Sequence, residues 1–125
     1  MNKVFLTFLI LIFFSIKTLS QTSLLDSIHL EKMEFHKNIN NDSTLYFIKK
    51  LKSSKKRKTK VSVLSVEAYI YYRQKKYLKS EKTALKLLNE VKKLPPNSNK
   101  EQFYFDLKIS AYNRLFWIKK NQEDY

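Results

Sequence analysis

Residues 62–93 constrain the fold of this chain more than any other stretch. Apolar and polar residues alternate there at helical spacing on both sides of the segment YYRQKKY, and Pro95 and Pro96 end the pattern. Apolar residues that recur every three or four positions mark one buried face of a helix, and proline cannot continue a helix because it lacks a backbone donor. The stretch therefore predicts two amphipathic helices, residues 61–76 and 78–93, which fold back on each other across a tight turn.

This pair resembles a tetratricopeptide repeat, in which a first helix closes on a tyrosine-rich turn and a second helix begins with a small residue. Leu64, Ala68 and Tyr71 take the large, small and aromatic positions of that repeat. Three positions depart from the pattern, namely Glu67, Lys75 in place of the turn glycine, and Ser80 in place of the small alanine. The resemblance implies an all-α fold of about five helices in antiparallel pairs, stacked as a right-handed solenoid.

The composition excludes several classes of enzyme. The chain has 125 residues, no glycine and no cysteine. Without glycine it cannot form a glycine-rich phosphate loop, a dinucleotide fingerprint or a nucleophile elbow. Without cysteine it has no disulfide, thiolate metal ligand or thiol nucleophile. The length allows one small domain.

The titratable side chains do not form a catalytic or metal-binding pattern. Most carboxylates stand singly, and Glu31 and Glu34 share their segment with lysines. His29 and His36 lie roughly 10 Å apart along a helix axis, which is too far for one metal ion without a further ligand. Glu67 falls on a helix that should be half buried, so we expect it to pair with a lysine or to turn sideways. We predict no enzyme, no cofactor and no metal site.

The beginning of the chain has the layout of a signal peptide. A basic start precedes an apolar run over residues 4–16, and the segment TLS at residues 18–20 places small residues at the cleavage-relevant positions. The run is shorter than the about 20 apolar residues that span a bilayer. We therefore expect residues 1–20 to be removed and residues 21–125 to be exported, periplasmic or secreted, without a stable membrane span. A retained anchor is the alternative.

Two helices are predicted between the signal peptide and the central pair. Residues 23–40 carry one imperfect apolar face, made of Leu25, Ile28, Phe35 and Ile39. A second helix starts at Asp42, a good N-cap, and continues to about residue 54. Thr44 takes the small position of a degenerate repeat, and the apolar side of this helix consists of Leu45, Ile48 and Leu51.

A last helix is predicted over residues 100–122. Its apolar stripe recurs at i, i+4, i+7 and i+11, and consists of Phe105, Ile109, Tyr112 and Phe116. Superposing residues 62–77 on residues 110–125 ends the chain at the turn after a first helix. We therefore expect a truncated array, in which this stripe is partly uncovered and promotes self-association. A signal peptide before such repeats is also similar to the exported sensor-input region of bacterial membrane regulators with AraC-type or LuxR-type DNA-binding domains.

The net charge of +14 favours acidic partners such as nucleic acid, an anionic membrane or an acidic protein surface. The alternative, which we favour, is that an AT-rich coding sequence produces this composition, in which lysine, asparagine, isoleucine, phenylalanine and tyrosine are abundant while glycine, alanine and proline are scarce, and that the charges are solvated surface. The densest basic run lies at residues 53–60 and includes Lys55, Lys56, Arg57, Lys58 and Lys60. We interpret it as a solvated linker whose cations lie at the C-terminus of a helix, where the helix dipole favours them. The rival interpretation is a small basic helical protein that binds nucleic acid through this run. We expect the run to be dispensable, because an exported protein does not normally meet nucleic acid.

The tetratricopeptide resemblance also implies a groove lined by the first helix of each pair. Carried over position by position, the groove residues are Tyr69, Tyr72, Arg73, Trp117, Lys120 and Asn121. The lysine and asparagine pattern with which some members clamp a peptide carboxylate is replaced by Ser62, Ser65 and Tyr69, so a chaperone-tail ligand is not expected. We predict a binding module for another protein or peptide, with Trp117 at or near the groove.

Overall fold

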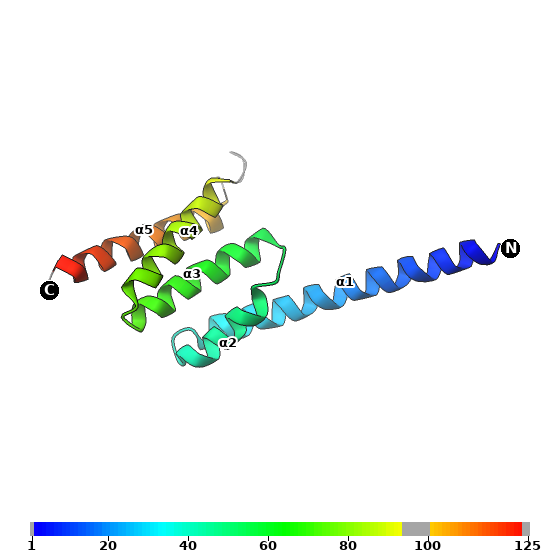
Figure 1. Cartoon of the computed structure of the whole chain (residues 1–125), viewed down its shortest axis with the longest axis horizontal. Helices are drawn as coiled ribbons and strands as arrows, with labels where there is room; N and C mark the ends of the chain where they lie inside the picture. Colours follow the sequence, from blue (N-terminus) through cyan, green and yellow to red (C-terminus); the bar gives the residue numbers. More distant parts are fainter. Residues whose placement is uncertain (1, 94–100, 124–125) are drawn as a thin grey trace.

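The computed structural model describes residues 2–93 and 101–123, and within residues 15–23 the helical backbone alone. Throughout these residues the regular structure is α-helical, which confirms the all-α prediction. The helices are α1 (Lys3–His36), α2 (Asn41–Leu51), α3 (Arg57–Arg73), α4 (Tyr77–Lys92) and α5 (Gln102–Glu123). In Figure 1, α1, α3 and α5 run in one direction, and α2 and α4 run in the other.

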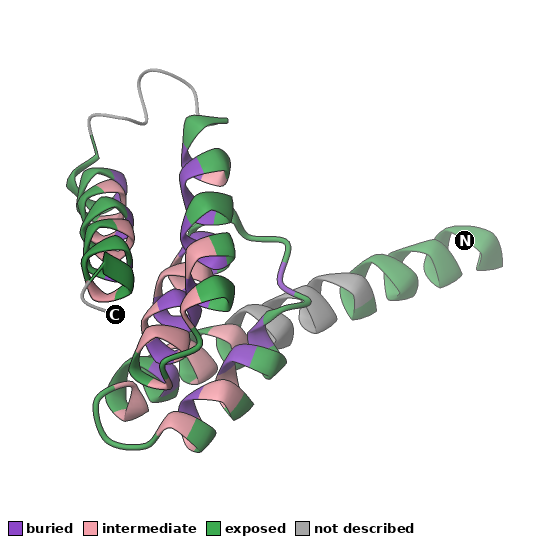
Figure 2. Ribbon diagram, turned by 60° about the vertical axis from the view of Figure 1, so that its left-hand side comes forward, coloured by how far each residue is buried: buried purple, intermediate pink, exposed green. Residues whose placement is uncertain are grey.

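Helix α3 is the centre of the fold because it contributes to two hydrophobic clusters. One cluster joins α3 to α1 and α2, and consists of Met33, Ile48, Leu51, Val63, Val66 and Ile70. The other joins α3 to α4 and α5, and consists of Val61, Leu87, Leu88, Val91, Tyr104 and Ala111. Figure 2 shows this burial along α3 and α4, whereas residues 3–14 at the start of α1 are exposed. A helix that is apolar on several sides has to be buried on several sides, so α3 lies between its neighbours.

Helix α1 differs from the sequence prediction in its length and in the face that it buries. It runs for 34 residues without a break, so the expected start at residue 23 is wrong. Both prolines of the chain lie elsewhere and there is no glycine, so no helix breaker separates the apolar run from the segment that follows. In Figure 1 the N-terminal half of α1 extends away from the other helices. No described helix combines the length and apolar character needed to cross a membrane.

The apolar face predicted for residues 23–40 is also wrong. Its four members are all exposed, namely Leu25, Ile28, Phe35 and Ile39. Among the described side chains of α1, Met33 is the one that is completely buried, and Leu30 packs beside it. This burial lies near the end of α1, against α2, which has 11 residues. A short partner buries a narrow strip, so the spacing of apolar residues did not identify which strip it is.

The N-cap of helix α2 lies two residues before the expected cap. The Asn40 side chain accepts a hydrogen bond from the Ser43 amide at 2.9 Å, so Asn40 and not Asp42 is the N-cap. Asp42 lies in the first turn, where the helix dipole favours its negative charge. The predicted apolar side is confirmed, because Ile48 and Leu51 are buried and Leu45 packs against their cluster.

The turn between α3 and α4 has the geometry of a helix end that usually requires glycine. Lys75 has φ of 59°. The Lys76 amide donates to the Tyr71 carbonyl, and the Lys75 amide donates to the Tyr72 carbonyl, each at 2.9 Å. These two bonds form a Schellman motif. On the far side of the turn the buried Ser80 hydroxyl donates to the Ala68 carbonyl at 2.6 Å, which joins the two helices through two small residues.

Helix α5 packs through residues that the predicted stripe does not contain. Its buried residues, Tyr104, Ala111 and Ile118, recur every two turns. Phe105, Ile109, Tyr112 and Phe116 lie on another side and are between 44% and 61% exposed, which confirms that the stripe is uncovered.

Candidate functional site

Three helices that are distant in the sequence contribute side chains to one surface. Tyr69, Tyr72 and Arg73 belong to the C-terminal half of α3, and Lys37 and Asn38 directly follow α1. Helix α5 adds Arg114, Trp117, Lys120 and Asn121. Contacts described below connect seven of these residues, and Trp117 with its neighbour Lys120 joins them through a hollow shared with Arg114. We name this surface the arginine–tyrosine face.

Arg114 lies at the centre of the arginine–tyrosine face. Its guanidinium carbon is 4.6 Å from the ring centroid of Tyr72 and 5.0 Å from that of Tyr69. Burial lowers the pKa of the Arg114 guanidinium below its usual range, while Tyr72 and Tyr69 act in the opposite direction. In the part of the chain that the structure describes, no carboxylate lies within ion-pair distance of Arg114. Among the described residues, the half-buried cation therefore has aromatic partners and no ion pair.

Hydrogen bonds hold both tyrosine rings in place. The Tyr69 hydroxyl donates to Oδ1 of Asn38 at 2.9 Å, and Nδ2 of Asn121 donates to the Tyr72 hydroxyl at 2.8 Å. Arg73 adds a bond of 2.9 Å to the Lys37 carbonyl. The rings are thus tied to the end of α1 and to α5, so the surface around Arg114 is fixed by three helices.

Two hollows open on the arginine–tyrosine face and share Ser110 and Arg114. One has a volume of about 320 Å³ and lies between the end of α1, α3 and α5, beside Tyr69. The other has a volume of about 450 Å³ and follows α5 to Trp117. Trp117 is 46% exposed, and Nζ of Lys120 lies 5.1 Å from its ring centroid. Arg114 and Ser110 thus lie where the two hollows adjoin.

The structure brings together the six residues that the sequence placed in a groove. Tyr69 lines the first hollow and Trp117 the second. The Arg73 guanidinium lies over the Tyr69 ring, Tyr72 contacts Arg114, Asn121 bonds to Tyr72, and Lys120 lies over Trp117. Sequence reasoning missed Arg114. The superposition of residue 62 on residue 110 places Arg114 on Val66, which is buried. A charged residue at an inward position of the repeat was the signal that could have identified it.

The basic run has a different position from the one expected. Arg57, Lys58 and Lys60 lie in the first turn of α3, so the prediction that these cations follow a helix C-terminus is wrong. The helix dipole disfavours cations at this end. Lys58 is held there by Glu101 at 3.6 Å and by the Phe103 ring at 5.6 Å, both at the beginning of α5. The remaining cations, Lys55 and Lys56, lie in the connection from α2.

The histidines and Glu67 have structural partners. His29 and His36 both lie against the Phe47 ring, with centroids 6.0 Å and 5.7 Å from it. Glu67 is buried and pairs with Lys52 at 3.2 Å, which confirms its predicted pairing with a lysine. These contacts join α1 to α2 and α2 to α3, so these residues hold neighbouring helices together.

Comparisons with protein-family models, with curated proteins and with solved structures found no match.

Proposed function

We propose that this chain is an exported, non-enzymatic helical module that binds an extended protein segment or peptide along the arginine–tyrosine face. The observation that carries the proposal is Arg114, a half-buried cation that contacts two tyrosine rings and has no carboxylate within ion-pair distance among the described residues. We also propose that the helices form a right-handed solenoid and that residues 1–20 are a signal peptide. The chain would then be the truncated sensor-input region of a membrane regulator.

The chemistry of Arg114 indicates what the bound segment carries. A guanidinium stacked on aromatic rings still offers the edge of its planar fork, which matches a carboxylate in a bidentate arrangement. Partial burial reduces screening by water, so an ion pair formed there is stronger than one on an open surface. We therefore expect the ligand to place one carboxylate on Arg114.

The second hollow indicates what accompanies that carboxylate. Trp117 and Ile109 line it together with Ser110, Asn113 and Asp106, and the Trp117 ring is partly exposed. The Asp106 carboxylate lies at the far end of this stretch of α5 and accepts a hydrogen bond from Gln102. Aromatic side chains bury a large area and contribute strongly to recognition in such hollows. We expect an apolar or aromatic side chain of the bound segment to lie against Trp117, next to the carboxylate on Arg114.

The test uses pairs of short synthetic peptides. Within each pair a phenylalanine precedes either a C-terminal aspartate or a C-terminal asparagine amide, and Trp117 fluorescence reports binding. We expect the acidic peptide to bind and Arg114→Met to weaken its binding by roughly tenfold or more, since a hydrogen bond to a charged group contributes about 1.5–3 kcal/mol. Trp117→Leu, measured by calorimetry because the fluorophore is lost, should weaken both peptides equally.

Arg73→Met is the matched control. Arg73 also stacks on the Tyr69 ring, at 5.6 Å, but it is exposed and donates to a backbone carbonyl. We expect this variant to change affinity by less than about threefold, as for an exposed charge. The proposal fails if the chain binds no acidic peptide, or if a single-stranded oligonucleotide binds and neutralising Lys55, Lys56 and Arg57 abolishes that binding.

A further inference from the structure

A third hollow lies on the opposite side of α3 from the arginine–tyrosine face. It has a volume of about 440 Å³ and lies between the end of α2, α3 and α4. Its lining residues are Leu51, Lys52, Lys60, Val63, Leu64, Glu67, Lys86 and Glu90. Those from α3 recur at i, i+3, i+4 and i+7, which is one helix face, and Tyr69 and Tyr72 point from another face. The hollow is therefore separate from the proposed peptide site.

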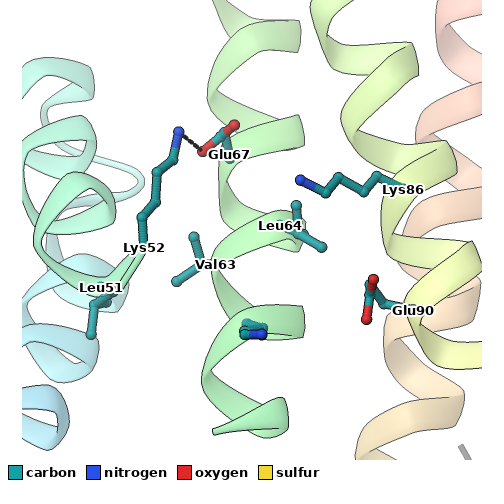
Figure 3. Close-up of a pocket in the computed structure, with 8 residues that line it drawn as sticks. Leu51, Lys52, Val63, Leu64, Glu67, Lys86 and Glu90 are labelled. Carbon is teal, nitrogen blue, oxygen red and sulfur yellow. Dashed lines mark ion pairs between the residues drawn. The ribbon is translucent and has the colours of Figure 1, made fainter. Parts of the chain in front are cut away.

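The charges of this hollow do not balance. Both lining carboxylates already have lysine partners, because Glu67 pairs with Lys52 and Glu90 pairs with Lys93, each at 3.2 Å. Lys60 and Lys86 have no carboxylate within ion-pair distance in the described parts of the chain. Figure 3 shows the Lys86 side chain extending from α4 toward α3. Among the described residues, Lys60 and Lys86 thus border the hollow without an ion pair, and its lining carries three lysines against two glutamates.

The wall between the charged residues is apolar. Figure 3 shows Val63 and Leu64 on α3 between Lys52 on one side and Lys86 on the other. Leu51 and Val63 are buried, with 1% and 4% exposure, so this wall is packed and does not depend on the ligand for its shape. A volume between roughly 300 and 1,000 Å³ with an apolar lining and a few polar groups is typical of small-molecule sites.

We propose that this hollow binds a fatty-acid-type monocarboxylate, with the carboxylate attracted by Lys60 and Lys86 and the alkyl chain against Leu64, the half-buried apolar residue of the wall. The positive excess of the lining and the two lysines without an ion pair favour a single negative charge, and the apolar wall favours an alkyl chain. A dianion such as inorganic phosphate fits less well, because Glu67 and Glu90 border the same hollow and repel a second negative charge. The same carboxylate could come from a free fatty acid or from a short organic acid, and chain length distinguishes these sources.

Calorimetric titration of the full chain with butyrate, octanoate and dodecanoate, each below its micelle concentration, tests the proposal. Affinity should increase with chain length, by roughly three- to fourfold for each methylene that becomes buried. The exposed apolar residues at the start of α1 also attract alkyl chains, so the decisive result is dependence on lysine. Lys60→Met and Lys86→Met should each weaken dodecanoate binding by about fivefold or more.

Glu67→Gln is a variant for which the proposal predicts tighter binding, because it removes a negative charge from the hollow and releases Lys52. We expect dodecanoate to bind more tightly to this variant than to the unaltered chain. Lys82→Met is the matched control on α4, since Lys82 is exposed and does not line the hollow, and it should leave affinity unchanged. Equal binding to Lys60→Met, Lys86→Met and Lys82→Met would overturn the proposal, as would phosphate binding as tightly as dodecanoate. Arg114→Met should have no effect, which separates this site from the peptide site.

Discussion

The backbone of Lys75 links the sequence to the fold at the scale of a single residue. In the tetratricopeptide pattern this position holds the turn glycine, and the lysine nevertheless adopts φ of 59°. A residue with a side chain is disfavoured in this region because Cβ approaches the following carbonyl oxygen. The departure was visible in the sequence, and the Schellman bonds of Lys75 and Lys76 show that the turn keeps its geometry without glycine.

Lys75→Gly should therefore stabilise the protein. Relief of the left-handed strain is worth about 1–2 kcal/mol, and the greater freedom of glycine in the unfolded chain offsets about 0.5–1 kcal/mol of it. A net gain of about 0.5–1 kcal/mol should appear as a higher midpoint in urea unfolding followed by circular dichroism. Lys76→Gly is the control, because Lys76 has φ of −86° and gains no relief, so its midpoint should fall. A lower midpoint for Lys75→Gly would show that the strain is not significant.

Arg114 shows why a site residue escaped prediction at the same scale. Periodicity marks positions that face inward, and a charged residue at such a position is ordinarily assigned to the surface. Its value as a ligand for an anion depends on the nearby rings of Tyr69 and Tyr72, which belong to another helix. Neighbours of that kind follow from the packing of α3 and α5, and no single-helix pattern contains them. Trp117 and Asn121 could be predicted from the sequence, because they occupy the positions that the tetratricopeptide pattern assigns to a groove.

At the scale of the elements, helices were predicted best where both neighbours and breakers constrain them. The α3 and α4 pair lies between the tight turn and the prolines, and its structure, Arg57–Arg73 and Tyr77–Lys92, differs from the prediction by a few residues at each end. Helix α1 was predicted worst. It has no internal breaker, and a short partner covers only one end of it, so neither its beginning nor its buried strip was encoded in the local spacing.

The close approach of α3 and α4 depends on Ser80. Its side chain is fully buried and donates to the Ala68 carbonyl. Ser80→Leu should destabilise the protein by about 1–3 kcal/mol because it overpacks this contact, whereas Ser80→Ala should cost about 1 kcal/mol or less. Thermal unfolding measures both, and Lys82→Leu on the exposed side of α4 should change stability by less than about 0.5 kcal/mol. Equal effects of Ser80→Leu and Lys82→Leu would show that the helices are not closely packed there.

At the scale of the whole molecule, an uncovered apolar stripe and a large positive charge have opposite effects on association. Phe105, Ile109, Tyr112 and Phe116 line one side of α5 and are each at least 44% exposed. An exposed stripe of this kind favours association, because burial of each large side chain contributes on the order of 1.5–3 kcal/mol. The formal charge of +14 on each chain opposes it. Salt screens the repulsion between charges and leaves the apolar attraction intact.

Association should therefore increase with salt, which is the reverse of the behaviour of an interface held by ion pairs. The comparison is best made on the form that begins at Gln21, because the exposed apolar residues at the start of α1 would associate independently. In sedimentation from about 0.05 M to about 0.5 M salt, the average mass should rise for this form. Phe105→Ser with Phe116→Ser should keep it monomeric. Leu78→Ser with Leu85→Ser is the matched control, because these leucines of α4 are 64% and 50% exposed and lie outside the stripe, so this variant should associate like the unaltered form. A monomer at every salt concentration would show that the stripe of α5 does not mediate self-association.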